Sequence, residues 1–258
     1  MINQKKTDVS DHSTYHLCSN CQYANDKIFY ALNDLPESLA LTSFCYESAP
    51  SSIYFFQSEG LSLPSNLTTA RTKRQAEYLA GRYCAGIGLK RLGADNFEVK
   101  ASRDRSPVWP ENYTGSISHS QGFAMAVTGE KARYRSIGVD IEKIVSESRA
   151  ERLSNTVLTD SDCELRSTLG LPIHWFFTLV FSAKESLYKL LHPELKRSMG
   201  FESACLSLLN TEQKTFTLTL TSGLSAEWQE GSHFTGNYFE IDGYLVTVLY
   251  LNASDASQ

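Results

Sequence analysis

Two carboxylates lie two residues apart in segment 137–142, which reads Ile-Gly-Val-Asp-Ile-Glu. Its strict alternation is typical of a β-strand, in which successive side chains point to opposite faces. Asp140 and Glu142 would then share one face about 6.6 Å apart, and both could reach one hard cation such as Mg²⁺. A solvent-facing strand that carries two acids is the alternative, and for an isolated pair it is the more common case.

A third carboxylate lies on a helix predicted over residues 172–191. Its apolar residues recur at helical spacing and form one core-facing stripe: Phe176, Leu179, Val180, Ala183, Leu187, Leu190 and Leu191. Glu185 lies about 200° around the helix from Ala183 and therefore points away from the stripe, with Lys189 one turn later. An ordinary surface pair, worth about 0.3–0.5 kcal/mol, would produce the same spacing.

Basic residues gather on one face of an earlier helix, predicted between Ser65 and Gly93 with Thr68 or Thr69 as its cap. At about 100° per residue, an arc of about 80° contains Arg71, Arg74, Tyr78 and Arg82. Arg74 and Arg82 would lie about 12 Å apart along the axis, which suits a ligand with phosphates at more than one place. A solvated helix face is the alternative.

His119 lies in the serine-rich segment 116–120, where hydroxyls, backbone N–H groups and an imidazole could surround a phosphate. Lys100 ends a predicted strand, and Arg103 and Arg105 follow it closely. A lone histidine is more often structural, so His119 by itself does not indicate a site.

The elements that must position these residues occur in two runs of helix followed by strands. Strands are predicted at 97–100, 115–119, 123–128, 136–142, 204–209 and 215–221, helical segments at 150–169 and 172–191, and a final hairpin at 237–241 and 244–251. The order predicts a duplicated α+β architecture with a linker near 129–135. We expect a leader or peripheral segment over 1–50, an N-terminal half over 51–132 and a C-terminal half over 133–258.

Composition narrows the possible functions. The 258 residues are 41% hydrophobic with a formal net charge of -5, so the chain can bury one large core or two smaller ones but lacks the broad positive surface of a nucleic-acid binder. The longest apolar stretch, 175–181, is far too short to span a membrane, and residues 1–10 do not begin a secretion signal. We therefore expect a cytoplasmic protein.

Five sequence blocks, in order, resemble the Sfp-type 4'-phosphopantetheinyl transferases, and more closely the enterobactin synthetase component D-like branch. They read KRQAEYLAGRYCA at 73–85, PVWP at 107–110 leading to GSISH at 115–119, IGVDIE at 137–142, FSAKESLYK at 181–189 and GFE at 200–202. Two positions depart from the pattern: Ile141 stands where some relatives have a third acid, and Ser106 where some have a basic residue.

The resemblance implies a pseudo-twofold pair of similar α/β halves, with the active site in the cleft between them. It assigns Asp140, Glu142 and Glu185 to Mg²⁺. It assigns the phosphates of coenzyme A to Arg74, Arg82, Lys100, Ser118 and His119. Lys184 and Lys189 would neutralise the diphosphate or assist the leaving group, and Glu185 is the candidate general base.

The implied reaction transfers the 4'-phosphopantetheine group of coenzyme A to a serine of an apo acyl or peptidyl carrier protein and releases adenosine 3',5'-bisphosphate. The expected partners are carrier domains of nonribosomal peptide synthases, above all for siderophores, or of polyketide or fatty-acid synthases. A monomer is expected, because two halves already form the site. Alternatives are a catalytically inactive subunit that docks carrier domains, and another Mg²⁺-dependent phosphotransferase or hydrolase, although no P-loop motif is present.

Overall fold

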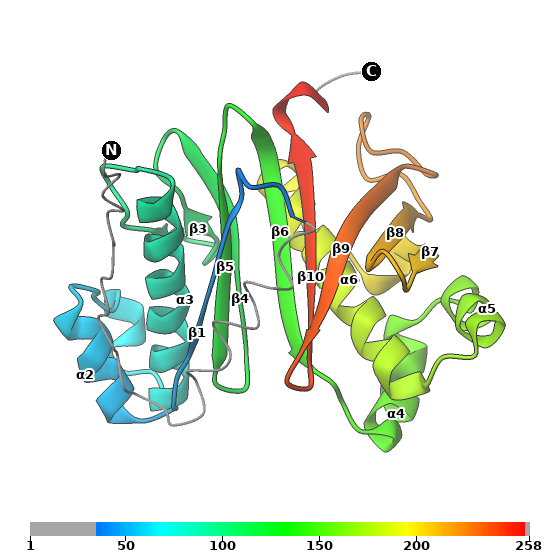
Figure 1. The fold of residues 1–258 in the computed structure, drawn as a ribbon, viewed down its shortest axis with the longest axis horizontal. Coiled ribbons are helices and arrows are strands. Elements are labelled where there is room, and N and C mark those ends of the chain that lie inside the picture. The colour runs from blue at the N-terminus through cyan, green and yellow to red at the C-terminus, as the bar shows by residue number, and fades with distance from the viewer. Residues whose placement is uncertain (1–34, 256–258) are drawn as a thin grey trace, which may run out of the picture.

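The computed structural model describes residues 35–255 and has the expected α+β class. Strands form a three-stranded sheet in the order β1-β5-β4, a five-stranded sheet in the order β6-β10-β9-β8-β7, and the pair β2-β3. Figure 1 shows the two larger sheets side by side, each packed against one long helix, α3 or α6. Most of the predicted leader, residues 1–34, lies outside the described residues.

The elements up to the end of the first larger sheet are β1 (Ala40–Cys45), α2 (Pro50–Ser58), α3 (Thr72–Arg91), β2 (Lys100–Ala101), β3 (Pro107–Val108), β4 (Tyr113–Ser120) and β5 (Phe123–Glu130). The remaining elements are β6 (Tyr134–Lys143), α4 (Glu147–Val157), α5 (Asp160–Leu169), α6 (Ile173–Leu195), β7 (Ala204–Asn210), β8 (Thr215–Leu220), β9 (His233–Ile241) and β10 (Tyr244–Asn252). Single 3₁₀ turns occupy Ser65–Leu67, Phe201–Ser203 and Ala253–Asp255.

Helix α6 forms because its apolar stripe packs on the five-stranded sheet. Every residue of the predicted stripe is at most 1% exposed, and the stripe shares a core with residues of β7 to β10. Burial of each large side chain stabilises the fold by about 1.5–3 kcal/mol. The helix continues past its predicted end at residue 191 to Leu195, where Lys196 takes a left-handed conformation.

Helix α3 packs on the three-stranded sheet but begins later than predicted. Residues 65–67 form a separate 3₁₀ turn, and the Thr68 hydroxyl donates to the carbonyl of Ser65 inside that turn. The predicted caps at Thr68 and Thr69 are therefore wrong, and α3 begins at Thr72.

Other differences from the sequence-based expectation are local. The predicted helical stretch 150–169 is two helices, because Thr159 is extended and forms a capping box with Asp162 at the start of α5. Strand β1 lies in the segment predicted as peripheral, and it pairs with β5. The β9–β10 turn uses positive φ at Asp242 and Gly243, as expected for an Asp-Gly hairpin.

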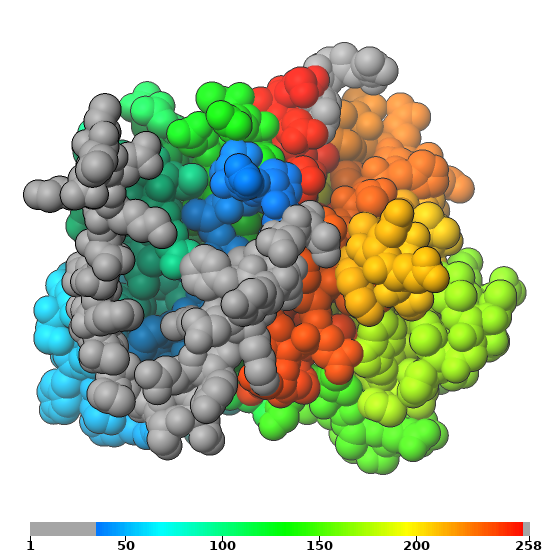
Figure 2. All heavy atoms as spheres, in the orientation of Figure 1, coloured from blue at the N-terminus to red at the C-terminus, as the bar shows by residue number. Residues whose placement is uncertain are grey.

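The shorter helices lie at the two ends of the molecule. Side chains of α2 and those of α4 and α5 lie at opposite ends of the molecule in Figure 2. Within residues 35–255, no helix combines the length and apolar character that crossing a membrane requires.

Candidate active site

Strand β6 separates an apolar face from an acidic one, as its alternation predicts. Ile137, Val139 and Ile141 are buried in a core shared with β1, β5, β9 and β10. Gly138, on the opposite face, lies against α6, where a Cβ would be 2.0 Å from the carbonyl oxygen of Ser186. Only glycine allows so close an approach of helix and strand. This close approach brings the polar residues of α6 next to Asp140.

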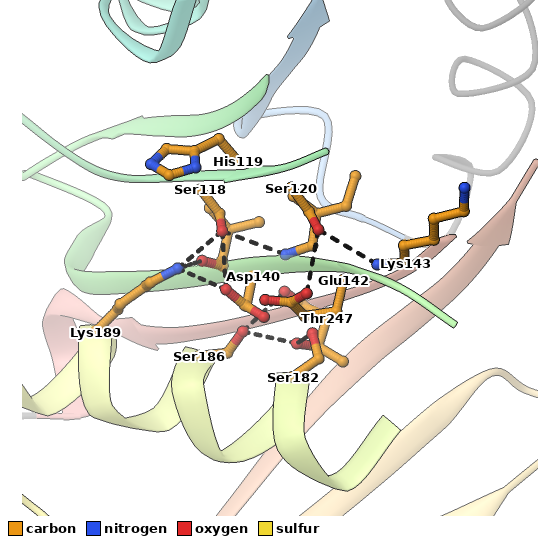
Figure 3. A network of polar contacts seen from close by, with 12 residues as sticks. Ser118, His119, Ser120, Asp140, Glu142, Lys143, Ser182, Ser186, Lys189 and Thr247 are labelled. Carbon is orange, nitrogen blue, oxygen red and sulfur yellow. Dashed lines mark hydrogen bonds and ion pairs between the residues drawn. The ribbon is translucent and has the colours of Figure 1, made fainter. Parts of the chain in front are cut away.

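Lys189 contacts strands of both larger sheets at this point (Figure 3). Its Nζ donates to Asp140 Oδ1 at 2.7 Å, to Ser118 Oγ on β4 at 2.9 Å and to the carbonyl oxygen of Val139 at 3.0 Å. The ammonium group therefore pairs with a strand carboxylate rather than with Glu185 on its own helix. All three of its N–H groups have partners.

The three predicted carboxylates form an electrostatically strained group. Asp140 is 3% exposed, and its Oδ2 has no hydrogen-bond partner among the described residues. Burial and the charge of Asp140 raise the pKa of Glu142 to about 7. The same two causes raise the pKa of Glu185. A cation between them would offset both effects.

The oxygen ligands and the unpaired Asp140 Oδ2 fit a hard divalent cation. However, no three acidic, histidine or cysteine side chains in the described part of the chain already converge into a complete metal site. The assignment of Asp140, Glu142 and Glu185 as ligands therefore stays a prediction.

His119 and Arg74 form a polar pair across β4 and α3. Arg74 Nη1 lies 3.3 Å from His119 Nε2 and 3.5 Å from Glu77 Oε2. Because a guanidinium group only donates, Nε2 must accept and the histidine proton lies on Nδ1. Burial, followed by the positive charges of Arg74 and Lys189, lowers the pKa of His119 against the opposing effect of Glu77. The imidazole is thus a neutral Nδ1–H donor.

Arg82 is not on a solvated face. Its side chain is buried, stacks on Tyr78 at 4.7 Å and leaves Nε without a partner among the described residues. Burial lowers the pKa of Arg82. It lines a cavity of about 360 Å³ together with Tyr83, Phe97 and Lys100. The site is suited to a phosphorylated nucleotide, because the buried guanidinium group can bind a phosphate and the aromatic rings can pack against a base.

Two cations on the cavity wall differ in their surroundings. Lys100 is exposed and lies 3.6 Å from Glu98. The sequence reasoning missed Lys90, whose Nζ lies 4.2 Å from the ring centre of Phe97. Its spacing of two turns after Arg82 on the same helix was the available signal.

The structure does not bring Lys184 to this group. Its side chain is 1% exposed, and Nζ donates to Asp162 Oδ2 at 2.8 Å and to the carbonyl oxygen of Val157 at 2.7 Å. The other carboxylate oxygen of Asp162 accepts the backbone N–H of Leu206 at 2.6 Å. Lys184 therefore ties α6 to α4, α5 and β7, and its ammonium group contacts none of the three predicted metal ligands.

Further hydroxyl groups surround the carboxylates, and of these the sequence indicated only Ser120, as part of the serine-rich segment 116–120. Ser120 Oγ donates to Glu142 Oε2 at 3.1 Å. Beneath them, Thr247 Oγ1 bonds to the hydroxyls of Ser182 and Ser186 at 2.9 and 2.7 Å, and all three side chains are buried (Figure 3). Thr247 lies opposite Asp140 in the register of β6 and β10. The sequence gives no signal for this pairing, because it depends on how the two strands are aligned.

Two family models match the chain in consecutive segments. The 4'-phosphopantetheinyl transferase N-terminal domain matches residues 63–129, and the 4'-phosphopantetheinyl transferase superfamily domain matches residues 136–249, which include all three carboxylates. An enterobactin synthase component D of Salmonella typhimurium is 33% identical over 71% of this chain and 74% of its own. The chain belongs to the 4'-phosphopantetheinyl transferase superfamily. The resemblance read from the five sequence blocks is thereby confirmed.

Other relatives agree with this family. The enterobactin synthase component D of Salmonella typhi is 36% identical over 60% of this chain, and the match spans 65% of that relative, slightly less than two thirds. The 4'-phosphopantetheinyl transferase PptT of Mycobacterium tuberculosis is 32% identical over 51% of this chain and 57% of its own length. Family membership implies coenzyme A as a substrate and a metal ion as a cofactor.

Proposed function

We propose that this protein transfers the 4'-phosphopantetheine group of coenzyme A to a serine of an apo carrier protein, with Mg²⁺ as the metal. The observation that carries the proposal is the meeting of Asp140, Ser118 and Lys189, from three elements and both family-matched segments, beside Glu142 and Glu185. The site offers oxygen ligands for a cation and positive side chains for a diphosphate, which are the requirements of this reaction.

In the proposed reaction, the carrier serine oxygen attacks the phosphorus that bears the pantetheine arm. The bond from that phosphorus to the bridging oxygen breaks, and adenosine 3',5'-bisphosphate leaves with the bond's electron pair. Glu185 accepts the serine proton, directly or through water. Mg²⁺ bound by Asp140, Glu142 and Glu185 would neutralise charge that develops on the diphosphate oxygens.

The remaining residues bind and orient the donor. Lys189 would exchange one of its present bonds, such as that to Ser118, for a diphosphate oxygen. The neutral His119 and Arg74 would bind a phosphate through N–H groups. The cavity beside Arg82 and Lys100 would hold the nucleotide, with its base against the aromatic wall and its 3'-phosphate on the buried guanidinium group.

The names of the relatives suggest the acceptor. Enterobactin synthase component D and PptT support a carrier domain of a siderophore or other nonribosomal peptide synthase as partner. We propose that the protein acts on it as a cytoplasmic monomer.

The proposal is tested by incubating the protein with coenzyme A and an apo carrier domain before and after EDTA treatment. We expect modification of the carrier to stop with EDTA and to return when Mg²⁺ is added. Glu185→Gln tests the proposed proton acceptor, and nearly full turnover in that variant would remove Glu185 from this role.

A further inference from the structure

Strands β4 and β6 run alongside each other where the two sheets meet, yet they belong to different sheets. The described residues show no backbone ladder between them. Two serine hydroxyls of β4 instead receive backbone N–H groups of β6: Ser118 Oγ accepts from Ile141 and Ser120 Oγ accepts from Lys143, both at 3.4 Å. Side chains therefore join the two sheets beside the carboxylates (Figure 3).

Each of these serines also donates to the carboxylate one residue earlier on β6. Ser118 Oγ donates to Asp140 Oδ1 at 2.8 Å, and Ser120 Oγ donates to Glu142 Oε2 at 3.1 Å. The same arrangement thus occurs twice at an interval of two residues on both strands. One oxygen of each carboxylate is held by a serine, and for Asp140 the other oxygen is the buried, unpartnered Oδ2.

The two arrangements differ in their support. Asp140 is held by Lys189 as well as by Ser118, whereas Ser120 is the hydrogen-bond donor to Glu142 among the described residues. Glu142 is a longer side chain with more rotamers to lose, so a single fixed donor determines more of its orientation. Ser120 is 8% exposed, which shields this bond from competition with water.

From this geometry we propose that Ser120 is a positioning residue: it binds one oxygen of Glu142 and turns the carboxylate toward the metal. The inference rests on the proposed function, because it concerns the same metal site. Loss of a hydrogen bond that orients a metal ligand commonly weakens metal binding about 10- to 100-fold. Ser120→Ala should therefore weaken metal binding about tenfold.

The test measures Mn²⁺ binding to the complete protein at pH 8, with and without coenzyme A, by the electron paramagnetic resonance signal of free Mn²⁺. Thermal unfolding of each variant is recorded beside it. Ser116→Ala is the matched control, because Ser116 is buried four residues earlier on the same face of β4 and forms no hydrogen bond with either carboxylate among the described residues. We expect weaker binding in Ser120→Ala and unchanged binding in the control.

A second pair of variants separates the hydroxyl from side-chain shape. Ser120→Thr keeps the hydroxyl group. Ser120→Val has nearly the same shape as the threonine variant but lacks the hydroxyl group. The Ser120→Thr variant should bind Mn²⁺ like wild type, and the Ser120→Val variant should bind it about tenfold more weakly. This comparison tests the positioning role even if the alanine variant does not fold. Equal binding in the threonine and valine variants, or in Ser120→Ala and wild type, would overturn the positioning role.

The same titration separates this inference from the proposed function. If wild type binds Mn²⁺ and Asp140→Ala does not, the metal site stands and the Ser120 variants test only its positioning. If wild type binds no Mn²⁺ even with coenzyme A, the proposed metal site itself fails and the inference falls with it.

Discussion

Lys189 on α6 and Asp140 on β6 form an ion pair of 2.7 Å across 49 residues of sequence. The lysine side chain is 25% exposed and that of the aspartate 5%, so the lysine lies at the edge of the site while the carboxylate is held inside. This arrangement lets Lys189 exchange a protein partner for an incoming anion. Asp140 thereby has two roles, as a predicted metal ligand and as the residue that aims Lys189.

Replacing Lys189 by methionine should lower the rate of carrier modification about 10²- to 10³-fold, because a positive donor at the developing charge is lost. Initial rates at saturating Mg²⁺ measure this loss. Lys143→Met is the control, since Lys143 is exposed and its side chain points away from the carboxylates in Figure 3. Equal rates in Lys189→Met and wild type would exclude Lys189 from the reaction.

The pKa of Glu142 predicts how stability changes with pH in the metal-free protein. Burial and Asp140 raise this pKa from 4.5 to about 7. The folded state therefore holds the proton more tightly than the unfolded state. The resulting contribution to stability is full below the unfolded pKa and is lost as the pH rises through about 7.

We therefore expect metal-free wild type to lose more thermal stability than Glu142→Gln between about pH 5 and pH 8. Added Mg²⁺ should raise the unfolding temperature of wild type more at pH 8 than at pH 6, because protons compete for the ligand. Unfolding followed by circular dichroism at each pH measures both. A stabilisation by Mg²⁺ that does not change with pH would contradict the assignment of Glu142.

Replacing Lys184 by methionine should mainly destabilise the fold. The change leaves Asp162 buried without its cation, and breaking such a pair commonly costs about 3–5 kcal/mol. Urea unfolding measures the loss, and the variant that remains folded at low temperature should turn over at nearly the wild-type rate. Normal stability with lost turnover would instead favour the role in phosphate chemistry that the family resemblance implies.

Arg82 should determine the affinity for coenzyme A. Arg82→Met is expected to raise the KM for coenzyme A about tenfold with a smaller change in kcat, because it removes a charged hydrogen bond to the bound nucleotide. Arg82→Lys should restore little, since a lysine has no planar group to stack on the ring of Tyr78. Arg133→Met, at an arginine 65% exposed on the β5–β6 turn, is the control. An unchanged KM would remove Arg82 from the binding site.

The sequence predicted the parts of the site that depend on local periodicity. Alternation along β6 placed Asp140 and Glu142 on one face, and the apolar stripe of α6 placed Glu185 and Lys189 away from the core. Lys184 escaped this reasoning because α6 is covered on a second side by α4 and α5 as well. Its partner Asp162 belongs to another helix, and helical periodicity carries no information about such contacts.

Contacts between the two sheets could not be predicted from local sequence patterns either. Ser118 and Ser120 alternate on β4, but their pairing with β6 depends on how two strands of different sheets are aligned. The position of strand β1 within the peripheral segment was not predicted, because its six residues combine Thr42 and Ser43 with apolar neighbours and have no distinct period. Pairing with β5 defines it as a strand.

The central claim is that the site around Asp140 and Lys189 transfers 4'-phosphopantetheine. The most direct measurement is the mass of an apo carrier domain after incubation with coenzyme A, Mg²⁺ and either wild type or Asp140→Asn. We predict that the carrier gains one 4'-phosphopantetheine group with wild type, while an equal amount of adenosine 3',5'-bisphosphate appears, and that Asp140→Asn is at least about 100-fold slower. No gain of mass on any of several carrier domains, or equal rates in the two proteins, would contradict the account.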